Sequence, residues 1–300
     1  MTNAGSRSRF VAILQAVLVV TLWSSSWVLI KFGLRDIPPL TFAGLRYVIA
    51  FLVLVPLALS RSRLRGLRRL TGHDWWRLTA LGLLLYAAGV GMQFVALSYL
   101  PTVTTRLLFA FSSVLVALLS GLLLRERATW LQWCGVLVVL SGVYLYFHPV
   151  DVPLIELPGI AAALCGALAF SLAAVVGRDV ARSRTISPLL VTAVSMGAGS
   201  VTLLATGLVV QGMPAISLRN WVIILWLSLV NTSFTFVLWN RTLQTLTAVE
   251  SNIITTAMIV EIALLAWVFL GERLTLLDQA GLALVILGTV LVQLRRLRAV

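Results

Sequence analysis

Ten apolar runs, joined by short links, constrain the fold of this chain more than any other feature of its sequence. A helix needs about 20 mostly apolar residues to cross about 30 Å of hydrocarbon. The runs lie at residues 11–32, 39–60, 78–100, 102–124, 130–147, 158–177, 187–210, 221–239, 249–270 and 276–294. We therefore expect an all-α membrane protein with ten transmembrane helices, for which the lipid bilayer is the solvent.

Composition supports this class and excludes several others. Hydrophobic residues make up 60% of the chain and charged residues only 11%. The net charge of +13 comes mostly from arginines in the links, so it reports membrane topology rather than a nucleic-acid partner. Cys134 and Cys165 fall inside predicted spans and have no metal-ligand spacing. We expect no nucleic acid, no metal and no cofactor.

The positions of the basic residues predict the orientation. If the N-terminus is cytoplasmic, the outer links and helix ends hold only four basic residues: Lys31, Arg35, Arg219 and Arg273. Nearly all the other basic residues then lie on the inner side, as the positive-inside rule requires. We expect both termini to be cytoplasmic, in a bacterial cytoplasmic (inner) membrane.

One stretch of the sequence occurs twice. Residues 124–145 and 270–291 align without a gap. The shared positions include Glu126 and Glu272, Gly135 and Gly281, and Gly142 and Gly288. Two copies of a five-helix unit must enter the membrane from opposite sides, because five is odd. We predict inverted repeats at 1–150 and 151–300, an architecture that can open a central site to each side in turn.

The repeated glycines predict close helix packing. Gly135 and Gly142 are one heptad apart, as are Gly281 and Gly288. Small residues at this spacing form a flat stripe on which another helix can pack. The stripe either joins the two halves or supports a dimer, so the chain is expected to be a monomer or a homodimer.

Several segments resemble the EamA family of the drug/metabolite transporter superfamily. They are LWSSSWVLIKFGLRDIPPLTFAGLRYVIA at residues 22–50, the two ERxT corners of the repeated stretch, and FVLWNRTLQTL at residues 236–246. The resemblance covers nearly the whole chain. It implies a ten-helix exporter or permease for small metabolites, with a central cavity between the halves. Where family members often have a proline in the fourth and ninth helices, this chain has Ser113 and Ile259.

Ionisable side chains inside the predicted spans are the first candidates for a site. Arg46, Arg106 and Glu261 would each cost a few kcal/mol facing lipid, so we expect them to face the bundle interior, water or a partner. Arg46 and Glu261 lie at comparable depth. Glu261 is interpreted as a proton carrier or a ligand for a substrate amine, with a fixed Arg46–Glu261 ion pair as the structural alternative. Arg106 can alternatively snorkel to the outer headgroups.

Aromatic and uncharged polar residues complete the candidate site. Trp23 and Trp27 share a face of the first helix, beside Ser24, and are interpreted either as a cavity wall or as packing. Three amides are further candidates: Gln93 on the third helix, Asn231 on the eighth and Asn252, which aligns with Arg106. For these amides, bonding between helices competes with substrate binding.

A secondary transporter, expected to export its substrate by alternating access, is the function that best fits these features. A cation, an anion, hydroxyls and aromatic rings together would suit amino acids or related amphipathic compounds. The alternatives are an intramembrane enzyme and a permease of the sugar or nucleotide-sugar type. We expect no catalytic residues, because the two histidines, His73 and His148, fall in links on opposite sides.

Overall fold

A computed structural model describes residues 3–58, 70–124, 130–148, 153–182 and 186–294, and every regular element in these ranges is helical. The first half contains five passes. They are α1 (Asn3–Gly33), α2 (Pro39–Ala58), the pass α4 (Gly72–Gly82), η1 (Leu83–Val90) and α5 (Gly91–Tyr99), the pass α6 (Thr102–Phe109) and α7 (Phe111–Leu124), and α8 (Trp130–Tyr146).

The second half also contains five passes within the described ranges, preceded by the short η2 (Leu154–Glu156). They are α9 (Leu157–Arg182), α10 (Pro188–Gln211), the pass α11 (Leu218–Ser228), η3 (Leu229–Phe234) and α12 (Thr235–Thr242), α13 (Ala248–Leu270), and α14 (Leu276–Leu294). Seven of the passes are long and apolar enough to cross a membrane, and three shorter apolar helices, in the fourth, fifth and tenth passes, complete the set. The predicted helical membrane fold is confirmed at this level.

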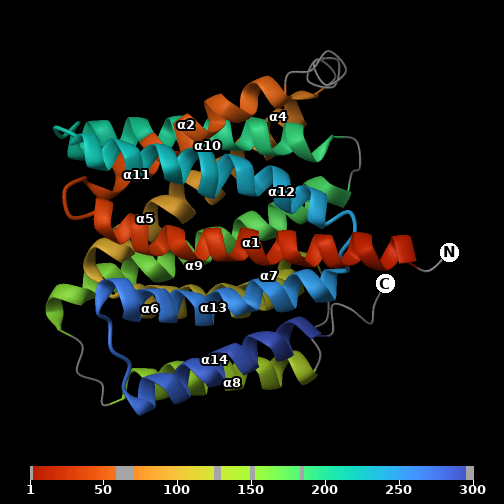
Figure 1. The fold of residues 1–300 in the computed structure, drawn as a ribbon, viewed down its shortest axis with the longest axis vertical. Helices are drawn as coiled ribbons and strands as arrows, with labels where there is room; N and C mark the ends of the chain where they lie inside the picture. Colours follow the sequence, from red (N-terminus) through yellow and green to blue (C-terminus); the bar gives the residue numbers. More distant parts are fainter. Residues whose placement is uncertain (1–2, 59–69, 125–129, 149–152, 183–185, 295–300) are drawn as a thin grey trace.

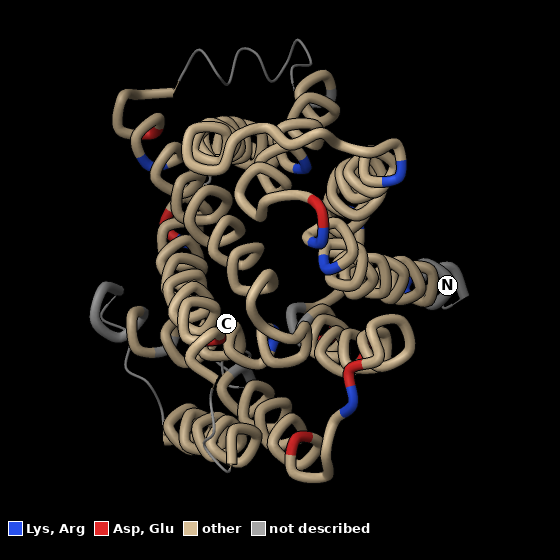
Figure 2. Tube along the Cα trace, turned by 90° about the vertical axis from the view of Figure 1, so that its left-hand side faces the viewer, with Lys and Arg blue, Asp and Glu red and all other residues tan. Residues whose placement is uncertain are grey.

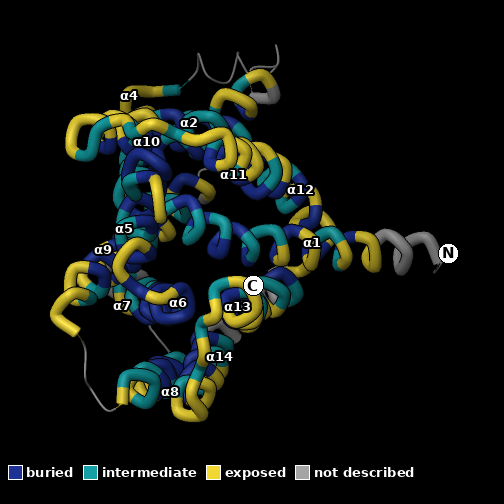
Figure 3. The backbone as a smooth tube through the Cα atoms, turned by 60° about the vertical axis from the view of Figure 1, so that its left-hand side comes forward, coloured by how far each residue is buried: buried dark blue, intermediate teal, exposed yellow. Residues whose placement is uncertain are grey.

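The passes run side by side along one direction, and α1 begins at the same end of the bundle at which α14 ends (Figure 1). Seen end-on, the helices carry few charged positions (Figure 2). Buried positions lie where helices meet, and exposed positions lie on their outward sides (Figure 3). The exposed residues include large apolar side chains such as Leu264 and Trp267 of α13, which is typical of a surface solvated by lipid.

In two of the passes, a capping residue starts the helix several residues before the apolar run predicted from hydropathy. Thr71 accepts a hydrogen bond from the Asp74 backbone N–H, and the Asp74 carboxylate accepts one in return from the Thr71 N–H. This capping box begins α4 at Gly72, although the apolar run begins at 78. Ser217 likewise caps α11 at Leu218, ahead of the predicted start at 221.

Two passes contain a wide π-helical segment. One is η1 (Leu83–Val90) in the third pass and the other is η3 (Leu229–Phe234) in the eighth. In η3 the Thr232 hydroxyl donates to the Leu227 carbonyl and the Ser233 hydroxyl to the Ser228 carbonyl, each five residues back. Such segments interrupt the regular helical ladder and are frequent at functional sites.

The glycine stripes join the two halves of the chain. A Cβ atom on Gly142 would lie 2.7 Å from the Gly281 carbonyl oxygen, and one on Gly288 would lie 2.7 Å from the Gly135 oxygen. Helices α8 and α14 are therefore antiparallel and packed backbone to backbone, at one edge of the bundle (Figure 1). Only glycine permits this approach. Of the two predicted roles for the stripe, the structure shows the contact between the halves.

Candidate functional site

A cavity of about 290 Å³ lies inside the bundle, at the small end of the range for ligand sites. Both halves of the chain line it. The lining residues are Trp23, Ser26, Trp27, Ile30, Arg46, Tyr47, Gln93, Phe94, Arg106, Phe109, Ser112, Phe170, Asn231, Thr232, Phe236 and Met258. Helices α8 and α14 contribute none of these residues, so the repeated stretch lies outside the site.

Arg46 enters the cavity from α2. Its side chain is 4% exposed, and its Nε donates a hydrogen bond of 3.1 Å to the Thr232 hydroxyl of η3. The guanidinium carbon lies 5.2 Å from the centre of the Tyr47 ring. The predicted ion pair with Glu261 is not formed among the described contacts. The π-helical turn of η3 therefore positions Arg46, and the rest of its guanidinium has no protein acceptor in the described ranges.

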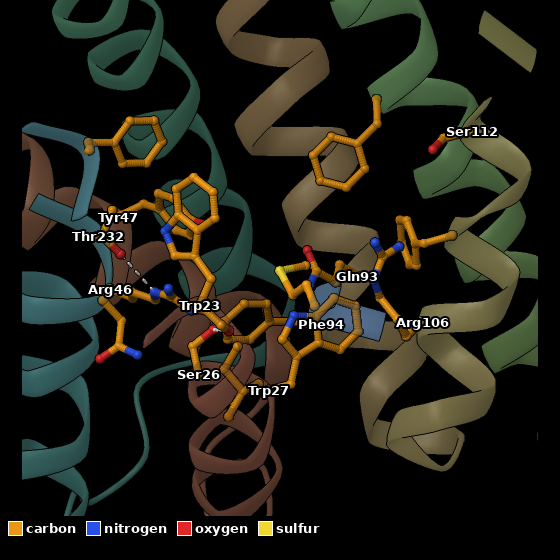
Figure 4. Close-up of a pocket in the computed structure, with 16 residues that line it drawn as sticks. Trp23, Ser26, Trp27, Arg46, Tyr47, Gln93, Phe94, Arg106, Ser112 and Thr232 are labelled. Atoms are coloured by element: carbon orange, nitrogen blue, oxygen red, sulfur yellow. Dashed lines mark hydrogen bonds between the residues drawn. The ribbon is translucent and has the colours of Figure 1, made fainter. Parts of the chain in front are cut away.

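Arg106 reaches the cavity from α6. Its Nε atom is buried without a hydrogen-bond partner, and no ion pair is formed by the side chain within the described chain. Figure 4 shows Arg46 and Arg106 on opposite sides of the site, with Trp23, Trp27 and Phe94 between them. Arg106 faces inward, so the alternative of a side chain extended to the headgroups is wrong.

Helix α1, which crosses the middle of the bundle, contributes both tryptophans of the aromatic wall. Trp27 is 6% exposed and Trp23 is partly buried. The Trp23 Nε1 donates 3.0 Å to the Thr235 hydroxyl, and its ring lies 5.3 Å from the Trp239 ring. These contacts fix the indole of Trp23 against α12, so Trp23 serves both packing and the wall. Trp27, in contrast, offers its ring to the space between the arginines (Figure 4).

The side-chain amides of Asn231 and Gln93 both line the cavity but differ in how many hydrogen bonds they form within the described ranges. The Asn231 Nδ2 donates to the Leu22 carbonyl and, at 3.1 Å, to the Ser25 hydroxyl, which joins η3 to α1. Its Oδ1 is buried without a partner. Gln93 lines the cavity and forms no side-chain hydrogen bond within the described ranges. Gln93 is the freer hydrogen-bonding group.

Two of the remaining candidates lie away from the cavity. The Ser24 hydroxyl is fully buried and donates 2.9 Å to the Val20 carbonyl of its own helix, so it is satisfied there. The Glu261 Oε1 accepts 3.3 Å from Thr21, at the contact of α13 with α1, and Oε2 is buried without a partner. Glu261 therefore does not supply an anion to the cavity. The Asn252 side chain lies outside what the structure describes.

Several cavity residues were not predicted from sequence. Tyr47, Phe94 and Phe109 lie close in sequence to predicted polar residues of the site. In a membrane protein, the residue type alone does not distinguish an aromatic side chain in a cavity from one that faces lipid. Phe170 is different. At the start of each half, Trp23–Ser24 matches Phe170–Ser171 at an interval of 147 residues, and both Trp23 and Phe170 line the cavity. The internal repeat was therefore a usable signal for Phe170.

Polar contacts tie the helices together at both ends of the bundle. At one end the Arg9 guanidinium pairs with Glu250, whose carboxylate also caps α13 by accepting from the Thr247 N–H at 2.9 Å. The backbone hydrogen bond from Thr247, with the Arg9 contact, lowers the pKa of Glu250 to about 2. Glu250 is thus a capping residue of α13.

At the other end, the Lys31 ammonium donates to the Leu97 and Leu100 carbonyls at 2.7 and 2.6 Å, which closes the C-terminal end of α5. Glu272 of the second ERxT corner accepts from the Thr102 and Val103 N–H groups at 2.7 and 3.1 Å and caps α6. Its counterpart Glu126 lies outside the described residues. His, Cys, Asp and Glu side chains form no group of three or more in the described ranges.

Known proteins resemble this chain over nearly its whole length. An Archaeoglobus fulgidus protein named an uncharacterized transporter is 26% identical over 93% of this chain and 97% of its own length. The Bacillus subtilis transporter YoaV is 26% identical over 93% and 95%. A Streptantibioticus cattleyicolor protein named a "probable terminal-alkyne amino-acid exporter" is 29% identical over 95% and 94%.

A solved crystal structure shares the fold, with a TM-score of 0.67 and 21% sequence identity over 94% of this chain and 97% of that one. The model of the EamA-like transporter family matches this chain twice, at residues 10–148 and 157–294, once on each side of the link between the halves. With its helical passes and its cavity lined from both halves, the chain is a multi-pass membrane protein that belongs to the EamA-like transporter family.

Proposed function

We propose that this protein is a secondary transporter that exports small amphipathic metabolites, in the chemical range of amino acids, across the bacterial cytoplasmic membrane. The observation that carries the proposal is the cavity itself. It is lined by α1, α2, α5, α6 and α7 from the first half and by α9, η3, α12 and α13 from the second. A site built at the interface of two halves can be opened by their relative movement.

The transport cycle we propose is alternating access between two inverted repeats, 1–150 and 151–300. Element positions support it, because η1 and η3 begin at Leu83 and Leu229, and α6 and α13 at Thr102 and Ala248, at one constant interval of 146 residues. The glycine contacts support it too. Shifting the pair Gly135–Gly288 by that interval gives Gly281–Gly142, which is the other close contact.

The direction and substrate range draw on the relatives and on the cavity wall. The Streptantibioticus protein bears the name of an amino-acid exporter. Trp27 and Phe94 provide an apolar wall, while Gln93 and the arginines provide hydrogen bonds. Such a mixture suits a small solute with a polar end and an apolar body. We propose that both termini lie in the cytoplasm, because the distribution of arginines favours this orientation.

Flux through vesicles tests this function. We expect vesicles containing the purified full-length chain to release preloaded amphipathic metabolites faster than empty vesicles. Trp27→Ala should reduce the rate about tenfold, because the indole forms the centre of the wall, whereas Trp76→Ala, an exposed residue of α4, should leave the rate unchanged. Equal release with and without the protein, over a panel of such solutes, would refute the transporter proposal.

A further inference from the structure

The charges around the cavity are all of one sign. Arg46 and Arg106 line it, and none of the eight acidic residues in the described ranges does. A carboxylate in the wall would neutralise the ammonium group of a zwitterionic substrate, and the described wall contains none. Glu261, expected at that place, is instead held by Thr21 at the outer contact of α1 and α13. The described wall therefore offers two cations and no anion.

The other acidic groups that the structure describes are placed elsewhere. Asp36 accepts a hydrogen bond from Asn220, Asp74 and Glu250 cap helices α4 and α13, and Asp179 pairs with Arg77. Glu272 caps α6 and Asp278 accepts from the Thr275 N–H, while Glu156 lies in the short η2. Within these ranges, no carboxylate neutralises either arginine of the cavity.

A buried guanidinium without an acceptor is costly, and it cannot lose its proton to relieve that cost. Arg46 has a single hydrogen bond, to Thr232, and the Nε of Arg106 has none. Charged side chains are retained inside membrane bundles where they serve a substrate or ion pathway. Arginine also presents a planar fork of donors that matches a carboxylate or phosphate group. Both side chains thus lack the acceptors that an anionic solute would bring.

We propose that the substrate is an organic anion, with more acidic than basic groups and an apolar or aromatic body. Its acidic groups accept hydrogen bonds from Arg46 and Arg106, on opposite sides of the cavity, while its body packs against Trp27 and Phe94 between them (Figure 4). This narrows the proposed function and rests on it. Among amphipathic metabolites, it selects acidic amino acids, their relatives without an amine, and comparable phosphates, over neutral amino acids and amines.

Three probes with the same phenyl body test the charge rule. Phenylsuccinate carries two carboxylates, phenylalanine is a zwitterion and phenethylamine is a cation. We expect the purified full chain to bind radiolabelled phenylsuccinate saturably at pH 7, with phenylalanine and phenethylamine competing at least tenfold more weakly. Arg106→Gln should weaken phenylsuccinate binding about tenfold to hundredfold. Arg106→Lys should retain part of the affinity, because lysine keeps the positive charge but lacks the planar set of donors of a guanidinium group.

Arg219→Gln is the matched control, because Arg219 is exposed at the start of α11, and it should bind phenylsuccinate as the unaltered protein does. Failure to bind phenylsuccinate, or equal binding by Arg106→Gln and Arg219→Gln, overturns the inference. Flux of the same probes through vesicles separates the two proposals. Arginine-dependent binding without flux upholds the anionic site and refutes transport, whereas flux of phenylalanine or phenethylamine alone upholds transport and refutes the charge rule.

Discussion

The α8–α14 pair and the central cavity use the internal repeat in opposite ways. In the pair, the same glycines occur in both halves, and each copy packs on the other. In the cavity, the two halves differ, because Arg106 aligns with Asn252 and the π segments carry different side chains. The glycines shared by the two halves thus build the α8–α14 pair, which we call the frame, whereas the arginines and amides of the cavity are not repeated. We therefore expect substitutions in the α8–α14 pair to change stability and substitutions in the cavity to change binding.

The largest effect is expected in the frame. Gly142→Ala places a methyl group 2.7 Å from the Gly281 oxygen, in contact with backbone that cannot rotate away. We expect the free energy of unfolding to fall by about 1–3 kcal/mol, or the protein not to assemble at all. Thermal unfolding of the detergent-purified protein, followed by gel filtration, measures this change.

The matched control for that change is Gly177→Ala. A Cβ there would lie 3.6 Å from a Leu81 methyl group, which is ordinary contact. Alanine is also the better helix former by about 1 kcal/mol, so stability should be kept or increased. If Gly142→Ala were as stable as Gly177→Ala, the close packing of α8 on α14 would not be what holds the halves together.

Substitution in the cavity should have the opposite effect, with binding lost and stability kept. Arg106→Met removes a partly buried cation whose Nε has no partner in the described ranges, so we expect stability to be unchanged or raised by about 1 kcal/mol while phenylsuccinate binding is lost. Lys31→Met is the comparison, because that ammonium donates to two carbonyls. Its removal should cost about 1–3 kcal/mol in the unfolding free energy. If the Arg106→Met protein unfolded more easily than the Lys31→Met protein, the main role of Arg106 would be to stabilise the fold.

A smaller effect is expected at the end of the bundle, where Glu250 caps α13. Its pKa is lowered to about 2 from an ordinary value of 4.5, so its ionised form stabilises the folded state. That stability is present above pH 4.5 and is lost as the pH falls toward 2. The gap in melting temperature between the unaltered protein and Glu250→Gln should therefore close over this range. A gap that did not change with pH would assign the stabilisation to something other than the carboxylate charge.

The sequence predicted the frame better than the site, for a physical reason. Length and hydropathy predict how many passes there are, and the shared glycines predict close packing, because both depend on residues near one another in the chain. The site depends on which way a side chain faces. Arg46 and Glu261 are predicted to lie at comparable depth, yet Arg46 reaches the cavity and Glu261 contacts Thr21 of α1. Depth along a helix is readable from sequence, whereas rotation about its axis is not.

Local hydrogen bonding explains the other differences between the predicted site and the observed one. Sequence predicts Ser24 as a polar wall residue, but its hydroxyl donates to the Val20 carbonyl of its own helix, as serine often does inside apolar segments. The widened turn in η3 brings Thr232 to Arg46, and no residue in Leu229–Phe234 marks such a turn in advance. The energetic cost of a charge in the membrane was the reliable signal, and it identified Arg46 and Arg106 correctly as interior residues.

Access to Gln93 tests most directly whether the cavity is the site of transport. In a chain whose native cysteines are replaced (Cys134→Ala, Cys165→Ala), Gln93→Cys introduces a thiol into the wall, and a membrane-impermeant thiol reagent is added from one side of sealed vesicles at a time. We predict labelling from either side, slowed from both by phenylsuccinate. Labelling from one side only, at a rate that phenylsuccinate does not change, would contradict a cavity that carries substrate across the membrane.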